Sequence, residues 1–287
     1  MDILNGCCCL TVASALIVCA IAAFFVLNRK WTLPENYSKW VTKDYPKDVV
    51  LLHMTSRGAF APSLSPFPIK LETYFRIANI PYKNVFSLKF GPKGKFPWME
   101  YNGEVVADSE FCIRFLNDKL GVDLNKHLTS EQKATTRILQ RMIDEHFYWP
   151  YVYHRWVFDK KAKTLLLNKV PKIVIWWFRR KLESACNGQG IGRHSQDEIK
   201  HIARTDLQTL SDFLGTKKFM MGDEISEVDC AVFGQLVQVR WQIDDCPAGI
   251  IIKEHQNLLE YLDRIKEKVW PDWEECTTKG GTVEATA

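Results

Sequence analysis

The sequence lacks the cysteine and histidine patterns that hold metal ions or build a disulfide framework. None of its nine cysteines forms a C-x-x-C pair: Cys7, Cys8 and Cys9 are consecutive, Cys19 lies in an apolar segment, and the others are scattered. None of the seven histidines has a second histidine four residues away. We therefore expect neither a metal site nor a disulfide-stapled secreted domain. The cysteine usage favours a reducing compartment, in which most cysteines of the globular part are small core residues.

The chain also lacks the strong positive charge of a nucleic-acid-binding protein. Its formal net charge is +4 over 287 residues, and we expect no nucleic-acid partner. The charge is unevenly placed, because residues 160–181 contain eight Lys or Arg and no acid, which leaves the rest of the chain at −4. Within this basic segment, the aromatic and apolar run at 173–178 is flanked by cations. Two interpretations remain open: a core helix with solvated ends, or a basic aromatic surface that contacts an anionic membrane leaflet.

An uncharged, largely apolar run of 21 residues occupies positions 7–27. As a helix it would be about 31 Å long, close to the ~30 Å hydrocarbon core of a bilayer. A cleavable signal peptide is the alternative, but the preceding residues include Asp2 and no Lys or Arg. We therefore predict a transmembrane anchor over 7–27 and a linker over 28–47. The cations that follow the run, beginning with Arg29 and Lys30, place the globular part of this single-pass membrane protein in the cytosol.

Residues 48–121 show an α/β pattern. The short apolar run at 49–54 predicts a buried strand. After a loop, Ser65 and Pro66 have the N-cap and first-turn chemistry of a helix start. The further elements expected are a strand over 85–90, a hairpin that turns at Asn102-Gly103, and a helix that begins at Asp108-Ser109 and ends near Gly121.

Residues 128–275 are helical in pattern throughout. Thr129 with Gln132, and Ser226 with Asp229, have the spacing of capping boxes at helix starts. Asp229 is expected to be structural, because it closes the capping box of an apolar core helix. The small and polar residues at 276–287 predict a disordered tail.

Taken together, these motifs resemble the glutathione S-transferase fold. They are SPF-x-x-K-L-E after the first strand, KFPWMEYNG leading into the hairpin, ADS at the helix start, and the SEVD capping box in an all-helical second domain. More closely, SPFPIKLETYFRIANIPY, GIGRHSQDEI and FMMGDEISEVDCAVFGQL resemble the failed-axon-connections branch. That branch includes the nematode cadmium-responsive proteins and is related to the metaxins. The resemblance implies an α/β plus all-α fold, in which a thioredoxin-like N-terminal domain precedes a glutathione-transferase-type helical C-terminal domain.

The resemblance also implies a glutathione site with roles at particular residues. Pro97 would be the cis-proline before the third strand, and it would present the backbone of Phe96 to the cysteinyl part of glutathione. Asp108 and Ser109 would hold the γ-glutamyl end. Ser65 stands where related proteins keep a reactive cysteine. Homodimers are common in this fold.

Whether the expected glutathione site can activate the thiol depends on Ser65. Its hydroxyl could donate a hydrogen bond to the glutathione thiolate, as could Ser63 or Ser56, or it could be a plain helix N-cap. Asp108 and Ser109 likewise either bind ligand or only cap their helix. Because neither position 65 nor position 68 is a cysteine, thiol–disulfide exchange through a mixed disulfide is not expected. No tyrosine follows the first strand directly to replace the serine as donor.

Three functions follow from these observations. The first is a membrane-anchored, cytosol-facing stress-response or adaptor protein of the failed-axon-connections and cadmium-responsive type, with weak or no catalysis. The second is an active glutathione S-transferase that conjugates glutathione to electrophiles, with Ser65 as the catalytic donor. The third is a metaxin-like component of protein handling at an organelle membrane.

Overall fold

The computed structural model describes residues 38–278 except 44, 168, 169 and 244, and these residues belong to one compact unit. The strands are β1 (Val50–Met54), β2 (Tyr82–Phe86), β3 (Trp98–Tyr101) and β4 (Glu104–Ala107). The helices are α2 (Pro66–Ile77), α3 (Ser109–Leu120), α4 (Ser130–Arg141), α5 (Tyr148–Tyr153), α6 (Lys163–Leu167), α7 (Lys172–Gln189), α8 (Gln196–Leu214), α9 (Glu227–Val237), α10 (Pro247–Ile251) and α11 (Gln256–Val269). Short π-helical segments at Met142–Phe147, His154–Phe158 and Gln238–Gln242 extend α4, α5 and α9, and 3-10 turns lie at Ser38–Trp40, Ile191–Arg193 and Ile252–Glu254.

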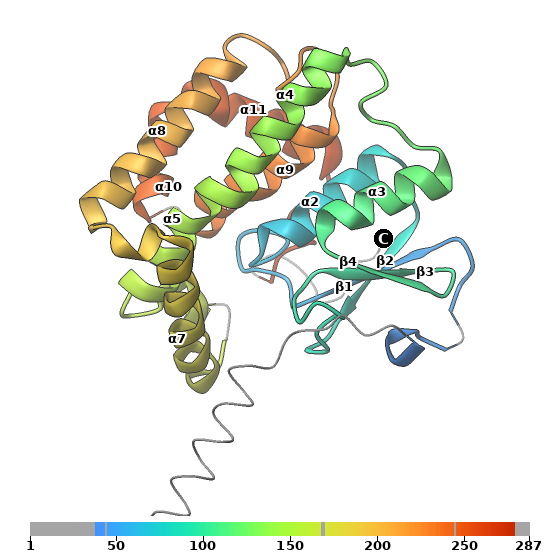
Figure 1. Cartoon of the computed structure of the whole chain (residues 1–287), viewed down its shortest axis with the longest axis horizontal. Coiled ribbons are helices and arrows are strands. Elements are labelled where there is room, and N and C mark those ends of the chain that lie inside the picture. Colours follow the sequence, from blue (N-terminus) through green and yellow to red (C-terminus); the bar gives the residue numbers. More distant parts are fainter. Residues whose placement is uncertain (1–37, 44, 168–169, 244, 279–287) are drawn as a thin grey trace, which may run out of the picture. The chain divides into compact units, whose positions relative to one another are not determined.

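The four strands form one mixed sheet in the order β2-β1-β3-β4 (Figure 1). β1 and β2 are parallel and are joined through α2, whereas β3 is antiparallel to both β1 and β4. The β3–β4 hairpin turns at Asn102 and Gly103, whose φ angles of 48° and 83° are both positive. Two positive φ angles are what a two-residue primed turn requires, which explains why an Asn-Gly pair occupies this turn.

The two faces of the sheet are covered by different parts of the chain. On one face, Val50, Leu52 and Met54 pack in a core with apolar residues of α2 and α3. On the other face, the His53 ring stacks on Trp98 with a 3.6 Å centroid separation. Trp40 and Thr42 contact this second face. Trp40 Nε1 donates to the Phe90 carbonyl at 3.0 Å, and Thr42 donates to the buried Glu100 carboxylate through its N–H and its hydroxyl. Part of the stretch expected as a linker is therefore packed on the sheet.

The helical part is built around α9, whose residues 228–237 are all buried. A helix that is apolar on all sides must be surrounded, and α9 packs against α2 of the first domain as well as α4 and α11. Gly234 makes the approach to α2 very close, because a Cβ atom there would lie 2.7 Å from the Pro66 carbonyl oxygen. A buried ion pair adds polar contacts to the same interface: Lys70 of α2 lies 2.7 Å from the Asp144 carboxylate. Gln235 of α9 donates to the second oxygen of that carboxylate at 2.9 Å. The start of α2 is thus held against the helical domain.

The prediction of a single-pass membrane protein is wrong on the structural findings. No helix in the described part of the chain is both long and apolar enough to cross a bilayer. The two helices of at least 18 residues, α7 and α8, carry several charged side chains each. The predicted anchor at 7–27 lies outside the described residues, as do residues 28–37 of the linker and 279–287 of the tail. The cytosolic orientation that was derived from the anchor is withdrawn with it.

Candidate functional site

The strand register brings the sequence-predicted site residues to one edge of the sheet. His53, at the end of β1, pairs with Trp98, the first residue of β3, and Trp98 in turn pairs with Ala107, the last residue of β4. Phe96 and Pro97 directly precede Trp98, and their peptide bond is cis. Asp108 and Ser109 directly follow Ala107, and the loop from β1 to Ser65 begins at the same edge.

Asp108 and Ser109 form the start of α3. The Asp108 backbone has a φ of 87°, a conformation that non-glycine residues rarely adopt and that proteins often retain at binding sites. Its Oδ1 accepts a hydrogen bond from the Glu110 N–H at 3.0 Å, so the side chain caps the helix. Ser109 is the first helical residue and is buried. The positive end of the helix dipole at this point favours a carboxylate ligand.

Ser65 does not act as the plain N-cap that sequence reasoning offered as an alternative. It occupies the N-cap position of α2, with an extended backbone, but its side chain makes no capping hydrogen bond. The residue is half-buried, and its N–H donates to Ser63 Oγ at 3.1 Å. Ser63, one of the alternative donors, is fully buried. The Ser65 hydroxyl is therefore not used to cap the helix at whose N-terminus it stands.

The loop before Ser65 is held by side chains of the helical domain. Arg155 donates to the Leu64 carbonyl at 2.6 Å, and Gln238 donates to the Ser63 carbonyl at 3.0 Å. Arg155 also donates to the Gln238 side-chain oxygen at 2.7 Å. We call Arg155 and Gln238, which hold this loop and each other, the clamp. Burial lowers the pKa of the Arg155 guanidinium, which reflects how completely it is removed from water. Sequence reasoning missed this clamp, because Arg155 and Gln238 lie far along the chain in helices without any distinguishing motif.

Removal of the clamp should destabilise the protein measurably. In an Arg155→Met variant, the Leu64 carbonyl and the Gln238 side chain lose a buried donor, and we expect a loss of about 2–4 kcal/mol in the free energy of unfolding. Urea unfolding followed by circular dichroism measures this loss. The matched control is Arg114→Met on the exposed side of α3, which should stay within about 0.5 kcal/mol of the unmodified chain. Equal stability of the two variants would show that the clamp is not a structural element.

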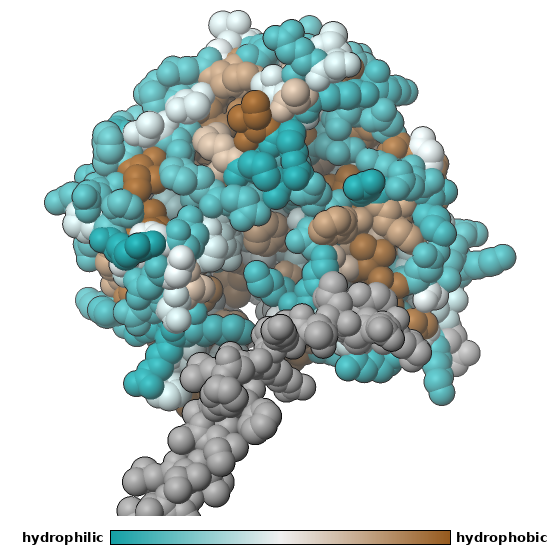
Figure 2. All heavy atoms as spheres, viewed as in Figure 1, coloured by the Kyte–Doolittle hydropathy of each residue, from teal (hydrophilic) through white to brown (hydrophobic). Residues whose placement is uncertain are grey.

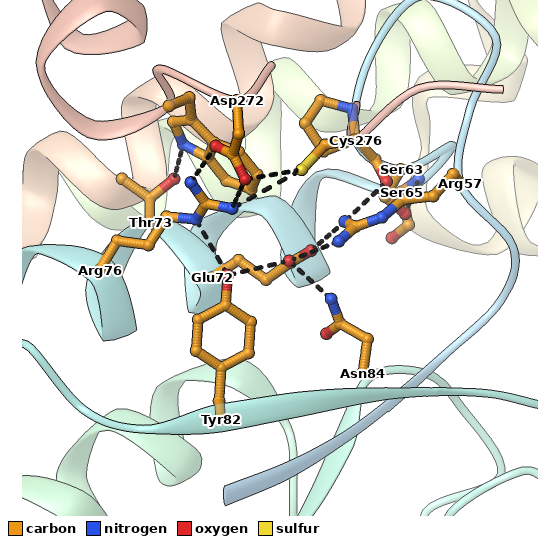
Figure 3. Close-up of polar contacts among 12 residues, drawn as sticks. Arg57, Ser63, Ser65, Glu72, Thr73, Arg76, Tyr82, Asn84, Asp272 and Cys276 are labelled. Carbon is orange, nitrogen blue, oxygen red and sulfur yellow. Dashed lines mark hydrogen bonds and ion pairs between the residues drawn. The ribbon is translucent and has the colours of Figure 1, made fainter. Parts of the chain in front are cut away.

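A second buried network lies beneath α2 (Figure 3). Arg57, from the loop after β1, and Glu72 of α2 form a two-bond ion pair at 2.6 and 3.0 Å, and both side chains have 0% exposure. Asn84 and Tyr82 of the β2 strand donate to the same Glu72 carboxylate, at 2.9 and 3.3 Å. The network connects the loop that leads to Ser65, the middle of α2 and the neighbouring strand through buried hydrogen bonds.

The segment after α11 contacts and stabilises the C-terminal end of α2. Arg76 makes two hydrogen bonds to Asp272, at 2.5 and 2.8 Å (Figure 3). Its guanidinium also lies over the Trp270 ring, 4.0 Å from the ring centroid. Trp270 Nε1 donates to Thr73 Oγ1 at 3.0 Å. Further along, the Thr278 N–H donates to the Gly58 carbonyl at 2.9 Å, which anchors the loop after β1 as well. Both ends of α2 are therefore fixed by residues distant in sequence.

The described residues contain neither a reactive cysteine pair nor a cluster of metal ligands. The five cysteines there, Cys112, Cys186, Cys230, Cys246 and Cys276, are all free and buried. Burial raises the pKa of the Cys246 thiol to about 11, so it is not a reactive thiolate. No group of three or more metal-ligating side chains occurs in the described ranges. A cavity of about 170 Å³ lies between α5, α8 and α10, and none of the sequence-predicted site residues lines it.

Comparison with known proteins agrees with this architecture. The glutathione S-transferase N-terminal domain family matches residues 66–161, and the glutathione S-transferase C-terminal domain family matches residues 203–265. Among solved structures, a beta-etherase from Sphingobium sp. strain SYK-6 superposes with a TM-score of 0.55 at 18% identity, and the match covers 78% of this chain and 99% of that one. This likeness confirms the thioredoxin-type first domain and the helical second domain.

Three curated relatives show which members of the superfamily the chain is similar to. Failed axon connections of Drosophila melanogaster is 31% identical over 82% of this chain, and the chain spans only 62% of that protein's length. An isoprene-epoxide glutathione S-transferase of Rhodococcus sp. strain AD45 is 28% identical over 72% of this chain and 93% of its own length. Metaxin-2 of Mus musculus is 21% identical over 81% of this chain and 92% of its own length. The chain belongs to the glutathione S-transferase superfamily and is similar within it to failed axon connections and the metaxins.

Proposed function

We propose that this protein binds glutathione at the sheet edge, with the Ser65 hydroxyl as hydrogen-bond donor to the thiol. The observation that carries the proposal is the Ser65 side chain, which stands at the N-terminus of α2 without a capping role. A hydroxyl left unused at such a position suits a bound thiolate, because the helix dipole favours a negative charge there. The named activity of the Rhodococcus relative, a glutathione S-transferase, supports glutathione as the ligand.

The other site residues would bind the remainder of the tripeptide. The backbone of Phe96, which with Pro97 directly precedes β3, would pair with the cysteinyl main chain. The γ-glutamyl carboxylate would lie at the N-terminus of α3, where Ser109 is the first residue. Asp108 would attract the γ-glutamyl ammonium through its charge, because only one of its two oxygens takes part in capping.

The start of α2 also limits how strongly a thiol can be activated. Proline has no backbone N–H, and α2 begins with Pro66 and has Pro68 two residues later. Among the first three helical residues, only Phe67 can therefore donate a backbone hydrogen bond to a thiolate. Activation then depends mainly on Ser65, and we infer that conjugation to electrophiles is slow. Binding of glutathione, in a stress-response or adaptor role, is the main function we propose, with weak transferase activity as its chemical consequence.

Glutathione titration of the full chain by isothermal calorimetry tests this proposal. We expect saturable binding at millimolar glutathione or below, and a dissociation constant about tenfold higher for Ser109→Ala, because one hydrogen bond to a charged group is lost. Ser130→Ala is the matched control, since Ser130 is also the first residue of a helix but belongs to α4. Its affinity should equal that of the unmodified chain. Absence of binding heat at millimolar glutathione would refute the proposed function.

The same preparations separate binding from catalysis. Conjugation of glutathione to a chloronitrobenzene electrophile should be detectable but slow, and it should fall further in Ser65→Ala. Saturable binding with no conjugation above the rate in buffer would leave the protein as a glutathione-binding adaptor.

A further inference from the structure

Helix α7 carries two apolar stripes on opposite sides, and only one of them is covered. Ile175, Phe178 and Leu182 recur at helical spacing and face the body of the helical domain, where Phe178 packs on the Trp156 ring with a centroid separation of 5.6 Å. Ile173, Trp176 and Trp177 lie half a turn around the helix and are 70%, 52% and 50% exposed. The covered stripe already attaches α7 to the protein, so the exposed stripe is not needed for folding.

This exposed stripe is unusual on the surface of the molecule. Most of the face shown in Figure 2 is hydrophilic, with hydrophobic residues in small patches between polar ones. Trp176 and Trp177 are the two half-exposed tryptophans among the described residues, and they are adjacent. In Figure 1, α7 projects from the lower end of the helical domain, away from the sheet. The exposed fractions of Ile173, Trp176 and Trp177 show that the stripe faces away from the body of the protein.

Cations surround the two tryptophans. The Arg180 guanidinium lies over the Trp176 ring at 4.4 Å, and the Lys181 ammonium lies over Trp177 at 5.1 Å. Lys172, at the start of the helix, is also exposed. Arg179 is different, because it donates to the carbonyls of Trp156 and Asp159 and holds α7 in place. No acid occurs in the sequence between 160 and 182, so this face is positively charged as well as apolar.

We propose that the exposed face of α7 (Lys172, Ile173, Trp176, Trp177, Arg180 and Lys181) docks on an anionic phospholipid surface. Tryptophan is favoured at the level of lipid headgroups, because its ring is apolar and its indole N–H is polar. Arginine and lysine beside it bind lipid phosphates and extend their apolar stems along the acyl boundary. The positive charge of this face favours an anionic partner, since a neutral apolar partner would gain nothing from the three cations around the tryptophans. The contact is peripheral, made by one helix lying in the plane of the surface.

Hydroxyl-radical footprinting of the full chain tests this docking surface, because mass spectrometry reads the oxidation of each side chain separately. With vesicles of phosphatidylcholine and phosphatidylserine, oxidation of Trp176 and Trp177 should fall at least about threefold, as half-exposed rings become covered. Leu88 and Ile250, which are 84% and 56% exposed elsewhere, should be oxidised at unchanged rates. Pure phosphatidylcholine vesicles should give little protection, and raised salt should weaken the protection by phosphatidylserine.

The triple variant Lys172→Gln, Arg180→Gln and Lys181→Gln should lose this protection at the same vesicle concentration. A control triple variant, Lys83→Gln, Lys126→Gln and Lys133→Gln, removes the same charge from exposed positions elsewhere and should keep it. Equal protection by neutral and anionic vesicles would overturn the proposal, as would unchanged oxidation of the tryptophans with both. Protection that appears without lipid as the chain is concentrated would assign the face to a second copy instead.

Discussion

A Glu72→Leu variant should lose about 3–5 kcal/mol of unfolding free energy, a large part of the 5–15 kcal/mol that stabilises a typical domain. The substitution leaves the Arg57 guanidinium buried without its counter-ion, and the nearest remaining acceptor is the Pro62 carbonyl at 3.2 Å. Asn84 and Tyr82 lose their acceptor at the same time. Urea unfolding at neutral pH measures the loss.

Two comparison variants make this result specific to the buried charge. Adding Arg57→Met to Glu72→Leu should recover most of the lost stability, because a buried ion pair can be replaced by apolar side chains at little cost. Glu104→Ala breaks the exposed pair with Lys119, whose side chains are about half accessible, and should cost no more than about 1 kcal/mol. If Glu72→Leu costs no more than Glu104→Ala, the ion pair does not stabilise the site.

An Asp229→Ala variant should be destabilised by about 3–6 kcal/mol, because several buried donors lose their acceptor together. The Asp229 carboxylate accepts from the N–H groups of Met220 and Ser226, each at 2.8 Å, and from the Tyr261 hydroxyl at 3.1 Å. Burial raises the pKa of this carboxyl, and the hydrogen bonds from Met220 and Ser226 oppose the rise. Thermal and urea unfolding should both show the loss.

The matched control for Asp229→Ala is a substitution in a solvent-exposed capping box. Gln132→Ala removes the corresponding side chain from the box at Thr129 of α4, where both hydrogen bonds are exposed to solvent. Its cost should be about 1 kcal/mol or less. Similar effects of the two substitutions would mean that Asp229 acts only as a local cap and does not join α9 to α11.

Short sequence patterns predicted the turns and helix starts, because neighbouring residues determine these features. Asn102-Gly103 predicted a tight hairpin turn because both residues tolerate positive φ, and the structure has that turn. The spacing of Ser226 and Asp229 predicted the capping box at α9, which the structure contains. The second strand is shifted: it was expected over 85–90 and lies at Tyr82–Phe86. The pairing with β1 starts at Val50 and Tyr82, so the parallel partner determines the limits of β2.

The support of the candidate site could not be predicted from local patterns. The hydrogen bond from Arg155 to Leu64 spans 91 positions in the sequence, and the one from Gln238 to Ser63 spans 175. An isolated arginine or glutamine inside a helical stretch carries no sign of such a partner. The same holds for Arg57, which appeared as a loop residue and is one of the most buried side chains in the described structure. The start of α2 at Pro66 was predicted correctly, but the sequence left open whether the Ser65 hydroxyl caps this helix, and only the structure shows that it does not.

The most direct test of the account measures the thiol pKa of bound glutathione from the ultraviolet absorbance of its thiolate as pH is raised. With the unmodified chain, the pKa of the bound thiol should lie below that of free glutathione. In Ser65→Ala it should be about one unit higher than in the unmodified chain, because one hydrogen bond to the thiolate is lost. Ser63→Ala should leave the pKa unchanged, since the Ser63 hydroxyl is buried and accepts from Ser65. Identical titration curves for the unmodified chain and Ser65→Ala, both saturated with glutathione, would contradict the role assigned to Ser65.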